Sequence, residues 1–170
     1  QKTAYEIKEC DWSSDVCSSD LTLTVSYKIG GDWHFHCWPA TTDPGKKGVM
    51  EYHNAAGVAR LVEGQYRGSH AIGLHQGKYE ALRQAKNVKV YRDANRDMNY
   101  DETQIQEGVF GINIHKAGAD STYVENWSEG CQVFKKSADF DSFMAICKKA
   151  QAIHGNSFTY TLIESSDIVA

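Results

Sequence analysis

A mainly β domain is the fold class that this sequence predicts. Several short segments alternate apolar or aromatic residues with polar ones, which is the period-2 pattern of half-buried strands. One segment, about residues 137–154, carries apolar residues at helical spacing instead, and a last strand-like segment follows it. Many short strands with one substantial helix predict a domain built mainly from mixed β-sheets.

The first 21 residues are set apart from the rest. Residues 11–21 read DWSSDVCSSDL and have no hydrophobic periodicity, and one reading frame of a widely used short-read sequencing adapter encodes all of them. We therefore expect residues 1–21 to be an assembly artefact or a disordered arm, and leave them out of the fold prediction. A natural polar arm is the alternative. Residues 22–170 are long enough for a single domain with its own core.

The strand candidates share β-branched and aromatic residues in alternation. They are residues 22–29, 33–38, 58–62, 70–74, 88–91, 109–115 and 158–163. Gly30, Gly31 and Asp32 form a turn that joins the first two into a hairpin. The segment 109–115 (VFGINIH) is the most apolar, so we expect it to lie centrally in a sheet.

Two segments are predicted as helices. Residues 78–85 (KYEALRQA) predict a short one. The longer one, 137–154, has Ser137 as its expected N-cap and Gly155 as its C-terminal stop. Its apolar residues recur at helical spacing: Phe140, Phe143, Met144, Cys147 and Ala150.

The charge balance argues against a nucleic-acid partner. Without the two basic and five acidic residues of 1–21, the formal net charge is −1 rather than −4, whereas nucleic-acid binding normally needs a strong basic excess. No apolar run approaches the length that crosses a bilayer, so we expect no membrane span. We expect a monomer.

The cysteines leave room for a reactive thiol. Outside residues 1–21 the chain has Cys37, Cys131 and Cys147, an odd number with no close pair, which argues against a disulfide framework. Neither CxxC nor HExxH occurs, so a zinc site has little support and no cofactor is required by the pattern.

A histidine and a cysteine stand at the ends of a strand–loop–strand segment. Residues 111–115 (GINIH) would deliver His115 at the end of a strand, and residues 127–134 (WSEGCQVF) would present Cys131 on a tight turn before the next strand. A nucleophile and its base need rigid elements on both sides because they must come within hydrogen-bond reach. Cys131 is therefore the candidate nucleophile, and His115 is the base that would return its proton to a leaving amine.

The turn before Cys131 supplies candidate supporting groups. Gly130 permits a sharp turn, and the backbone N–H groups of Gly130 and Cys131 are candidate donors to an oxyanion. Ser128 would add a hydrogen-bonding wall. The alternative is a buried cysteine that serves as a small hydrophobe, with a structural histidine at the end of the strand.

This pattern resembles the L,D-transpeptidases of the YkuD-like family. These enzymes carry a histidine, a spacer of about fifteen residues and then Ser/Thr-His-Gly-Cys. Here His115 is followed by twelve residues and then Ser128-Glu129-Gly130-Cys131. The resemblance covers residues 33–134, and the TTDPG, GLHxGKYEAL and WSxGCQVF blocks resemble small bacteriophage-encoded proteins. Two positions differ from the family pattern: Glu129 replaces the second histidine, and Gln132-Val133 replaces an apolar residue followed by Arg or Asn.

The resemblance implies both a fold and an activity. The fold would be β-sandwich-like, and the enzyme would form a thioacyl intermediate on Cys131 with peptidoglycan stem peptides. Transfer to an amine gives a transpeptidase, and transfer to water gives a cell-wall peptidase. Such a protein would be periplasmic, extracellular or virion-associated. The alternative from another class is a non-catalytic virion or cell-wall-binding module with the same fold.

Other residues around this pattern have less specific interpretations. His75 can line the cleft or replace His115 as base, although a surface histidine at a turn is the simpler reading. Trp127 and Glu129 can also line the cleft, with core packing as the alternative for Trp127. Cys147 lies on the apolar stripe of the helix and is expected in the core, and Cys37 lies in a strand with alternating histidines.

A second cluster resembles the first half of a calcium loop. Oxygen-bearing side chains recur at every second position, namely Asp93, Asn95, Asp97, Asn99 and Asp101. Met98 stands where such loops have glycine, and Gln104 where they have glutamate. The cluster predicts a structural calcium site, with a solvated polar loop as the alternative.

Overall fold

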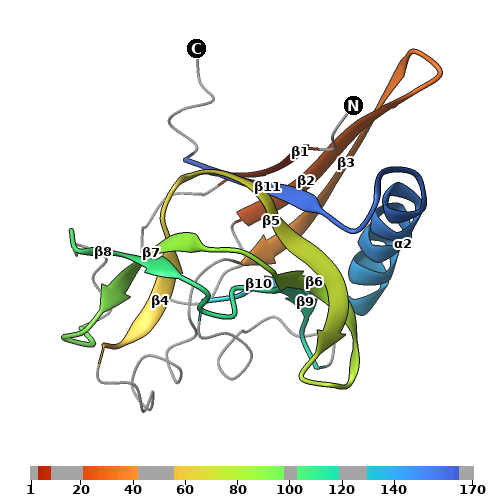
Figure 1. Ribbon diagram of the computed structural model, residues 1–170. Coiled ribbons are helices and arrows are strands. Elements are labelled where there is room, and N and C mark those ends of the chain that lie inside the picture. The colour runs from red at the N-terminus through yellow and green to blue at the C-terminus, as the bar shows by residue number, and fades with distance from the viewer. Residues whose placement is uncertain (1–3, 9–20, 42–55, 98–102, 119–129, 165–170) are drawn as a thin grey trace.

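The structure of the protein is a computed structural model that describes residues 4–8, 21–41, 56–97, 103–118 and 130–164 (Figure 1). In these residues, strands account for most of the regular structure, with one helix near the C-terminal end and a strand after it. The prediction of a mainly β fold with mixed sheets is therefore confirmed.

The larger sheet is a closed barrel with the strand order β1-β11-β5-β6-β9-β10-β3-β2. Its strands are β1 (Ala4–Lys8), β2 (Leu21–Ile29), β3 (Asp32–Thr41), β5 (Gly64–His75), β6 (Tyr79–Gln84), β9 (Ile114–Lys116), β10 (Gln132–Phe134) and β11 (Phe158–Ile163). Most neighbours are antiparallel, but β9 and β10 are parallel, as are β1 and β11. Two parallel neighbours require a long connection, and residues 117–131 provide it between β9 and β10.

A smaller antiparallel sheet lies beside the barrel, with the order β4-β7-β8. Its strands are β4 (Val58–Leu61), β7 (Val88–Asp93) and β8 (Ile105–Gly108). Figure 1 shows this sheet on the opposite side of the barrel from the helix α2 (Ser137–His154).

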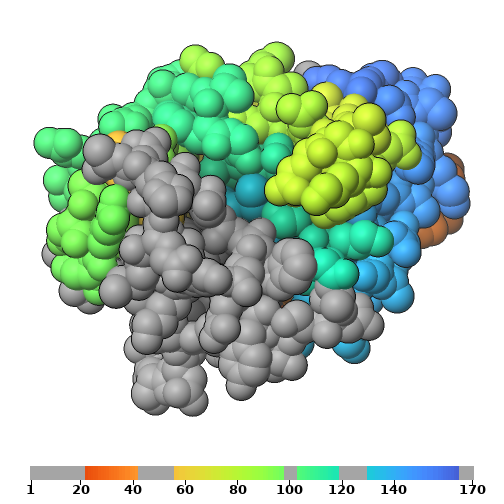
Figure 2. Space-filling model, turned by 90° about the horizontal axis from the view of Figure 1, so that it is seen from below, coloured from red at the N-terminus to blue at the C-terminus, as the bar shows by residue number. Residues whose placement is uncertain are grey.

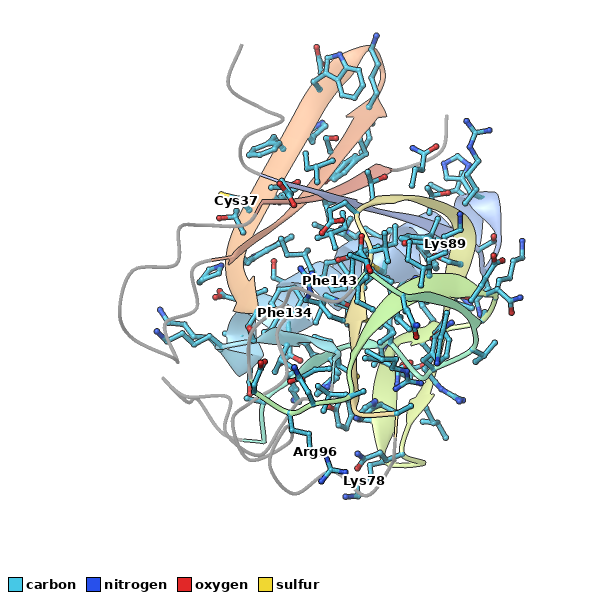
Figure 3. All side chains as sticks on the ribbon, turned by 90° about the vertical axis from the view of Figure 1, so that its left-hand side faces the viewer. Cys37, Lys78, Lys89, Arg96, Phe134 and Phe143 are labelled. Carbon is cyan, nitrogen blue, oxygen red and sulfur yellow. The ribbon has the colours of Figure 1, made fainter. Side chains whose placement is uncertain are left out.

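The core fills the barrel and continues under α2. The helix turns Phe140, Phe143, Met144 and Cys147 inward. Phe143 packs against Phe134 of β10, with ring centroids 5.1 Å apart, and edge-on against Trp38 of β3 at 5.9 Å (Figure 3). Cys147 is fully buried, as its place on the apolar stripe predicted.

The helix boundaries agree with the sequence, but the cap does not. The helix runs over 137–154 and ends at Gly155, whose N–H donates to the carbonyl of Gln151 at 2.9 Å. Ser137, however, is already the first helical residue, and the cap position is Lys136 in extended conformation with no side-chain bond. The acidic Asp139 in the first turn still complements the helix dipole.

The helix predicted over residues 78–85 is wrong, because Tyr79–Gln84 forms the strand β6. Gln76 and Gly77 both have positive φ, 51° and 72°, and the N–H of Lys78 donates to the carbonyl of His75 at 2.9 Å. This is the tight turn that joins two antiparallel strands, so the pairing with β5 overrides the helix-forming composition.

The strand predicted over residues 109–115 is also wrong for most of its length. Only Ile114–Lys116 pairs as β9, which lies between β6 and β10. The segment before it is irregular because side chains satisfy its backbone. Gln84 Oε1 accepts the N–H groups of Phe110 and Ile112, both at 3.0 Å, and Gln84 Nε2 donates to Gly108 O at 2.9 Å.

Structure also occurs within the first 21 residues. Ala4–Lys8 forms β1, which pairs with β2 and β11, and β2 begins at Leu21. Residues 9–20, which include most of the adapter-like stretch, lie outside the described residues. The adapter interpretation of residues 11–21 stays a prediction.

Candidate active site

Cys131 lies directly before β10, where two backbone groups hold its sulfur. The thiol donates to the carbonyl of Gly111 at 3.3 Å, and the N–H of Asn113 donates to Sγ at 3.5 Å. Both groups belong to the irregular segment that Gln84 ties down. An N–H aimed at sulfur stabilises a thiolate more than a thiol, because a negative charge accepts hydrogen bonds more strongly.

Gly130 is the position where only glycine fits. Its φ is +121°, and a Cβ there would lie 1.9 Å from the carbonyl oxygen of Ala59 in β4. The smaller sheet therefore packs its backbone against the turn that carries Cys131. This close approach agrees with the sharp turn that the sequence indicated at Gly130.

His115 is held in one tautomer by its own strand. Its Nδ1 lies 2.9 Å from the carbonyl oxygen of Lys116. A carbonyl only accepts, so the neutral ring carries its proton on Nδ1 and presents Nε2 as a base. Burial lowers the pKa of His115 to about 4, against a weaker opposing effect of the Lys116 carbonyl. The ring is therefore neutral at pH 7 and able to accept a proton.

The parallel pairing of β9 with β10 brings Cys131 next to the strand that carries His115. Gln132 pairs with Ile114 and Val133 with His115, and the N–H of Gln132 donates to the carbonyl of Asn113 at 2.9 Å. Cys131 is thus opposite Asn113, two positions from His115. Cys131 and Asn113 directly precede β10 and β9, and the hydrogen bond from Asn113 N–H to Sγ keeps the thiol at the start of the strand pair that carries His115.

His75, expected as a cleft residue, lies against His115. The two rings stack with centroids 4.3 Å apart and planes 20° apart. Asn113 Nδ2 lies 3.4 Å from His75 Nδ1. Burial lowers the pKa of His75, and the charges of Arg83 and Lys78 lower it further. The structure thus brings a second imidazole to the candidate base.

Tyr79 completes the group. Its hydroxyl donates to the same Lys116 carbonyl at 3.2 Å, and its ring centroid is 5.5 Å from that of His75. Burial raises the pKa of Tyr79, and the charge of a Cys131 thiolate raises it further.

The sequence interpretation missed Asn113, Gln84 and Tyr79. Asn113 stands two residues before His115, so strand alternation alone places both on one face and could have marked it. No comparable signal marked Gln84 or Tyr79, which lie in the segment predicted as a helix. Three expected residues, Trp127, Ser128 and Glu129, lie outside the described residues.

An open pocket of about 340 Å³ adjoins this group, between β6, β9 and α2. It is lined by Tyr79, Glu80, Lys116, Phe140, Asp141, Met144, Ala145 and Lys148. Figure 2 shows this face, where the turn between β5 and β6 (yellow-green) lies near α2 (blue). Two ion pairs border the pocket, Lys148 with Glu80 at 2.6 Å and Lys116 with Asp141 at 3.9 Å.

Of the other four cysteines, Cys10 and Cys17 lie outside the described residues, and the two described ones lie elsewhere in the fold. Cys37 is exposed on β3, on the outer side of the β2–β3 hairpin (Figure 3), and Cys147 is buried under α2. Neither has the neighbours that Cys131 has. They are matched internal controls for thiol reactivity.

The calcium-like cluster is described only in its first half. Asp93 Oδ1 accepts the N–H of Arg96 at 2.7 Å, and Asn95 Nδ2 donates to Asp97 Oδ2 at 3.0 Å. These side chains satisfy a turn, while Asn99 and Asp101 fall outside the described residues. In the part of the chain that is described, no three His, Cys, Asp or Glu side chains gather as a metal site. The calcium site stays a prediction.

Within the described ranges no helix is long and apolar enough to cross a membrane. In comparisons with protein families, curated proteins and solved structures, no family model, no curated protein and no solved structure matches this chain.

Proposed function

We propose that this protein is a cysteine acyltransferase or peptidase of the L,D-transpeptidase type that acts on peptidoglycan stem peptides. One observation carries the proposal: the thiol held by Gly111 and Asn113 lies at the start of the parallel β9–β10 pair that carries His115, whose Nδ1 proton is bound to the Lys116 carbonyl. The sequence resemblance supplies the substrate class.

The reaction begins with proton transfer. The Cys131 thiol exchanges the Gly111 carbonyl for His115 Nε2 and gives up its proton. The thiolate, which keeps the hydrogen bond from Asn113 N–H, attacks the carbonyl carbon of the amide that joins an L-centre to a D-centre. The resulting oxyanion takes hydrogen bonds from the N–H groups of Gly130 and Cys131.

Collapse of this intermediate uses the same histidine as an acid. His115 gives its proton to the leaving amine of the D-residue, the C–N bond breaks and a thioester remains on Cys131. The low pKa of His115, caused by burial, favours this release because the buried ring holds an extra proton weakly. A second amine or a water molecule then attacks the thioester and restores the thiol.

The test is covalent labelling. A carbapenem-class β-lactam acylates a nucleophile of this kind, so intact-mass analysis of the whole protein should show one adduct, mapped by peptide analysis to Cys131. Cys131→Ala should abolish the adduct, whereas Cys37→Ala, which removes an exposed thiol, should leave it unchanged. Equal labelling of Cys37 and Cys131 would reject catalysis and favour the non-catalytic wall-binding module.

The acceptor is tested separately on purified sacculi. New cross-links after incubation indicate transfer to an amine, and loss of cross-links or of terminal residues alone indicates transfer to water. Cys131→Ala protein is the control in both cases. Products that persist with this variant would show that the thiol does not carry the reaction.

A further inference from the structure

We propose that His75 is a second catalytic group, a neutral imidazole that holds the tautomer opposite to that of His115 and donates its Nε2–H to the carbonyl oxygen of the acyl substrate. The donor role rests on the proposed function, whereas the assignment of the tautomers rests on hydrogen bonds alone.

The first step is the orientation of the Asn113 side chain. The backbone N–H of Gln84 points at Asn113 Oδ1 over 2.9 Å. A backbone N–H only donates, so the oxygen of the amide is the atom on that side. The amide nitrogen Nδ2 is then the atom 3.4 Å from His75 Nδ1.

The second step is the tautomer of His75. An amide nitrogen only donates, so His75 Nδ1 accepts and the neutral ring carries its proton on Nε2. In the described part of the chain, no hydrogen bond from this Nε2–H to the protein is present. His75 is 8% exposed, and this N–H is the polar group of the ring that we assign to a ligand.

The third step is the contrast with His115. The Lys116 carbonyl fixes the proton of that ring on Nδ1, and the Tyr79 hydroxyl bonded to the same carbonyl helps to hold it in place. The two stacked rings, 4.3 Å apart, thus offer one Nε2 lone pair and one Nε2–H. One ring serves as a base and the other as a donor without any change of protonation.

Burial and neighbouring charges both favour neutral rings. Burial is the main cause that lowers the pKa of His75 and of His115, and the charges of Arg83 and Lys78 add to it for His75, as does that of His75 for His115. Two imidazolium rings in contact would repel, so the pair holds at most one additional proton. That proton arrives on His115 from the thiol, while His75 keeps its N–H for the oxyanion.

Asn113 is the positioning residue for both functions. Its backbone N–H bonds the Cys131 sulfur, and its side chain sets the tautomer of His75. The backbone of Gln84 in turn fixes the Asn113 amide. A single residue between the strands thus aligns the nucleophile and the donor.

The tautomers are tested in the intact protein by ¹⁵N NMR of histidine-labelled samples at pH 7. We expect His115 to show a protonated Nδ1 and His75 a protonated Nε2. In Asn113→Asp, a carboxylate oxygen replaces the amide donor, so His75 should gain a proton on Nδ1 while His115 is unchanged. The same tautomer on both rings of the wild type would overturn the proposal, whether or not the protein is an enzyme.

The donor role is tested by two reactions of Cys131. His75→Phe keeps a stacked ring without an N–H, and acylation by a carbapenem should fall about 100-fold, as for loss of one oxyanion donor. Alkylation by iodoacetamide forms no oxyanion and should change less than about threefold. Equal slowing of both reactions would mean that His75 acts on the thiol or on packing, which contradicts the donor role.

Discussion

Protonation of His70 should make this fold acid-sensitive. His70 lies in β5 with 1% of its surface exposed. Its Nε2–H donates to the carbonyl of Ile112 at 2.9 Å, and its Nδ1 lies 2.9 Å from the Ser69 hydroxyl. The ring thereby anchors the irregular segment that carries Gly111 and Asn113. Burial lowers the pKa of His70 from 6.5 to about 4, against a weaker opposing effect of the Ile112 carbonyl.

The loss of stability at low pH follows from the difference between the pKa of His70 in the unfolded and in the folded chain. The unfolded chain binds a proton at His70 near pH 6.5, whereas the folded protein does so only near pH 4. The stabilisation is therefore complete above pH 6.5 and is lost as the pH falls through about 4. At about 1.4 kcal/mol for each tenfold difference in proton affinity, the loss is about 3 kcal/mol. Single domains are stable by about 5–15 kcal/mol, so this is a large part.

Urea unfolding at pH values from 7 to 4 measures the loss. The free energy of unfolding of the wild type should fall by about 3 kcal/mol more than that of His70→Gln over this range. Carboxyl groups that titrate in the same window are common to both proteins and cancel. His154→Gln removes an exposed histidine at the end of α2 and is the matched control. Equal pH dependence in wild type and His70→Gln would refute the reasoning.

Three further changes test other features. The amide of Gln132 is fully buried and neither of its polar atoms has a partner in the described residues, so Gln132→Met should raise the free energy of unfolding by about 1–2 kcal/mol. A lower free energy of unfolding for this variant, measured with urea, would contradict this. Gly130→Ala should destabilise by about 3 kcal/mol or more because its Cβ meets the Ala59 carbonyl, whereas Gly77→Ala, with open space around its Cβ, should cost about 1–2 kcal/mol in the same assay. Gln84→Leu removes the side-chain hydrogen bonds to segment 108–112, so acylation of Cys131 should slow at least about tenfold while the far-ultraviolet circular dichroism keeps its strand signal. Unchanged acylation would show that the segment keeps its conformation without these bonds.

The sequence predicted the elements whose pattern is local. Residues 22–29 alternate regularly and form β2, and the spacing of Phe140, Phe143 and Cys147 defines α2. Residues 78–85 could not be assigned correctly from composition, because the deciding feature is the positive φ of Gln76 and Gly77 in the turn before them. Local composition gives way to pairing with β5 there.

In the candidate site, too, the sequence marked single residues but not the contacts that strand pairing makes. Cys131 and His115 stand out as residue types at a suggestive spacing, but their placement at neighbouring strands depends on the parallel pairing of β9 with β10, which links segments separated by a long loop. The contact of His75 with His115 depends on the order β5-β6-β9 in the barrel. Contacts of this kind arise from closure of the sheet and leave no periodic signal in the sequence.

The short strands around the site have a mechanical consequence. In the described residues, β6 pairs with β9 at one position and β10 with β3 at two, while β2 and β3 pair over nine. Thermal opening of a sheet begins where the fewest backbone hydrogen bonds must break. The strands around Cys131 and His115 are therefore expected to separate transiently before the others. The β2–β3 hairpin, with its nine paired positions, would keep its pairing during such an opening.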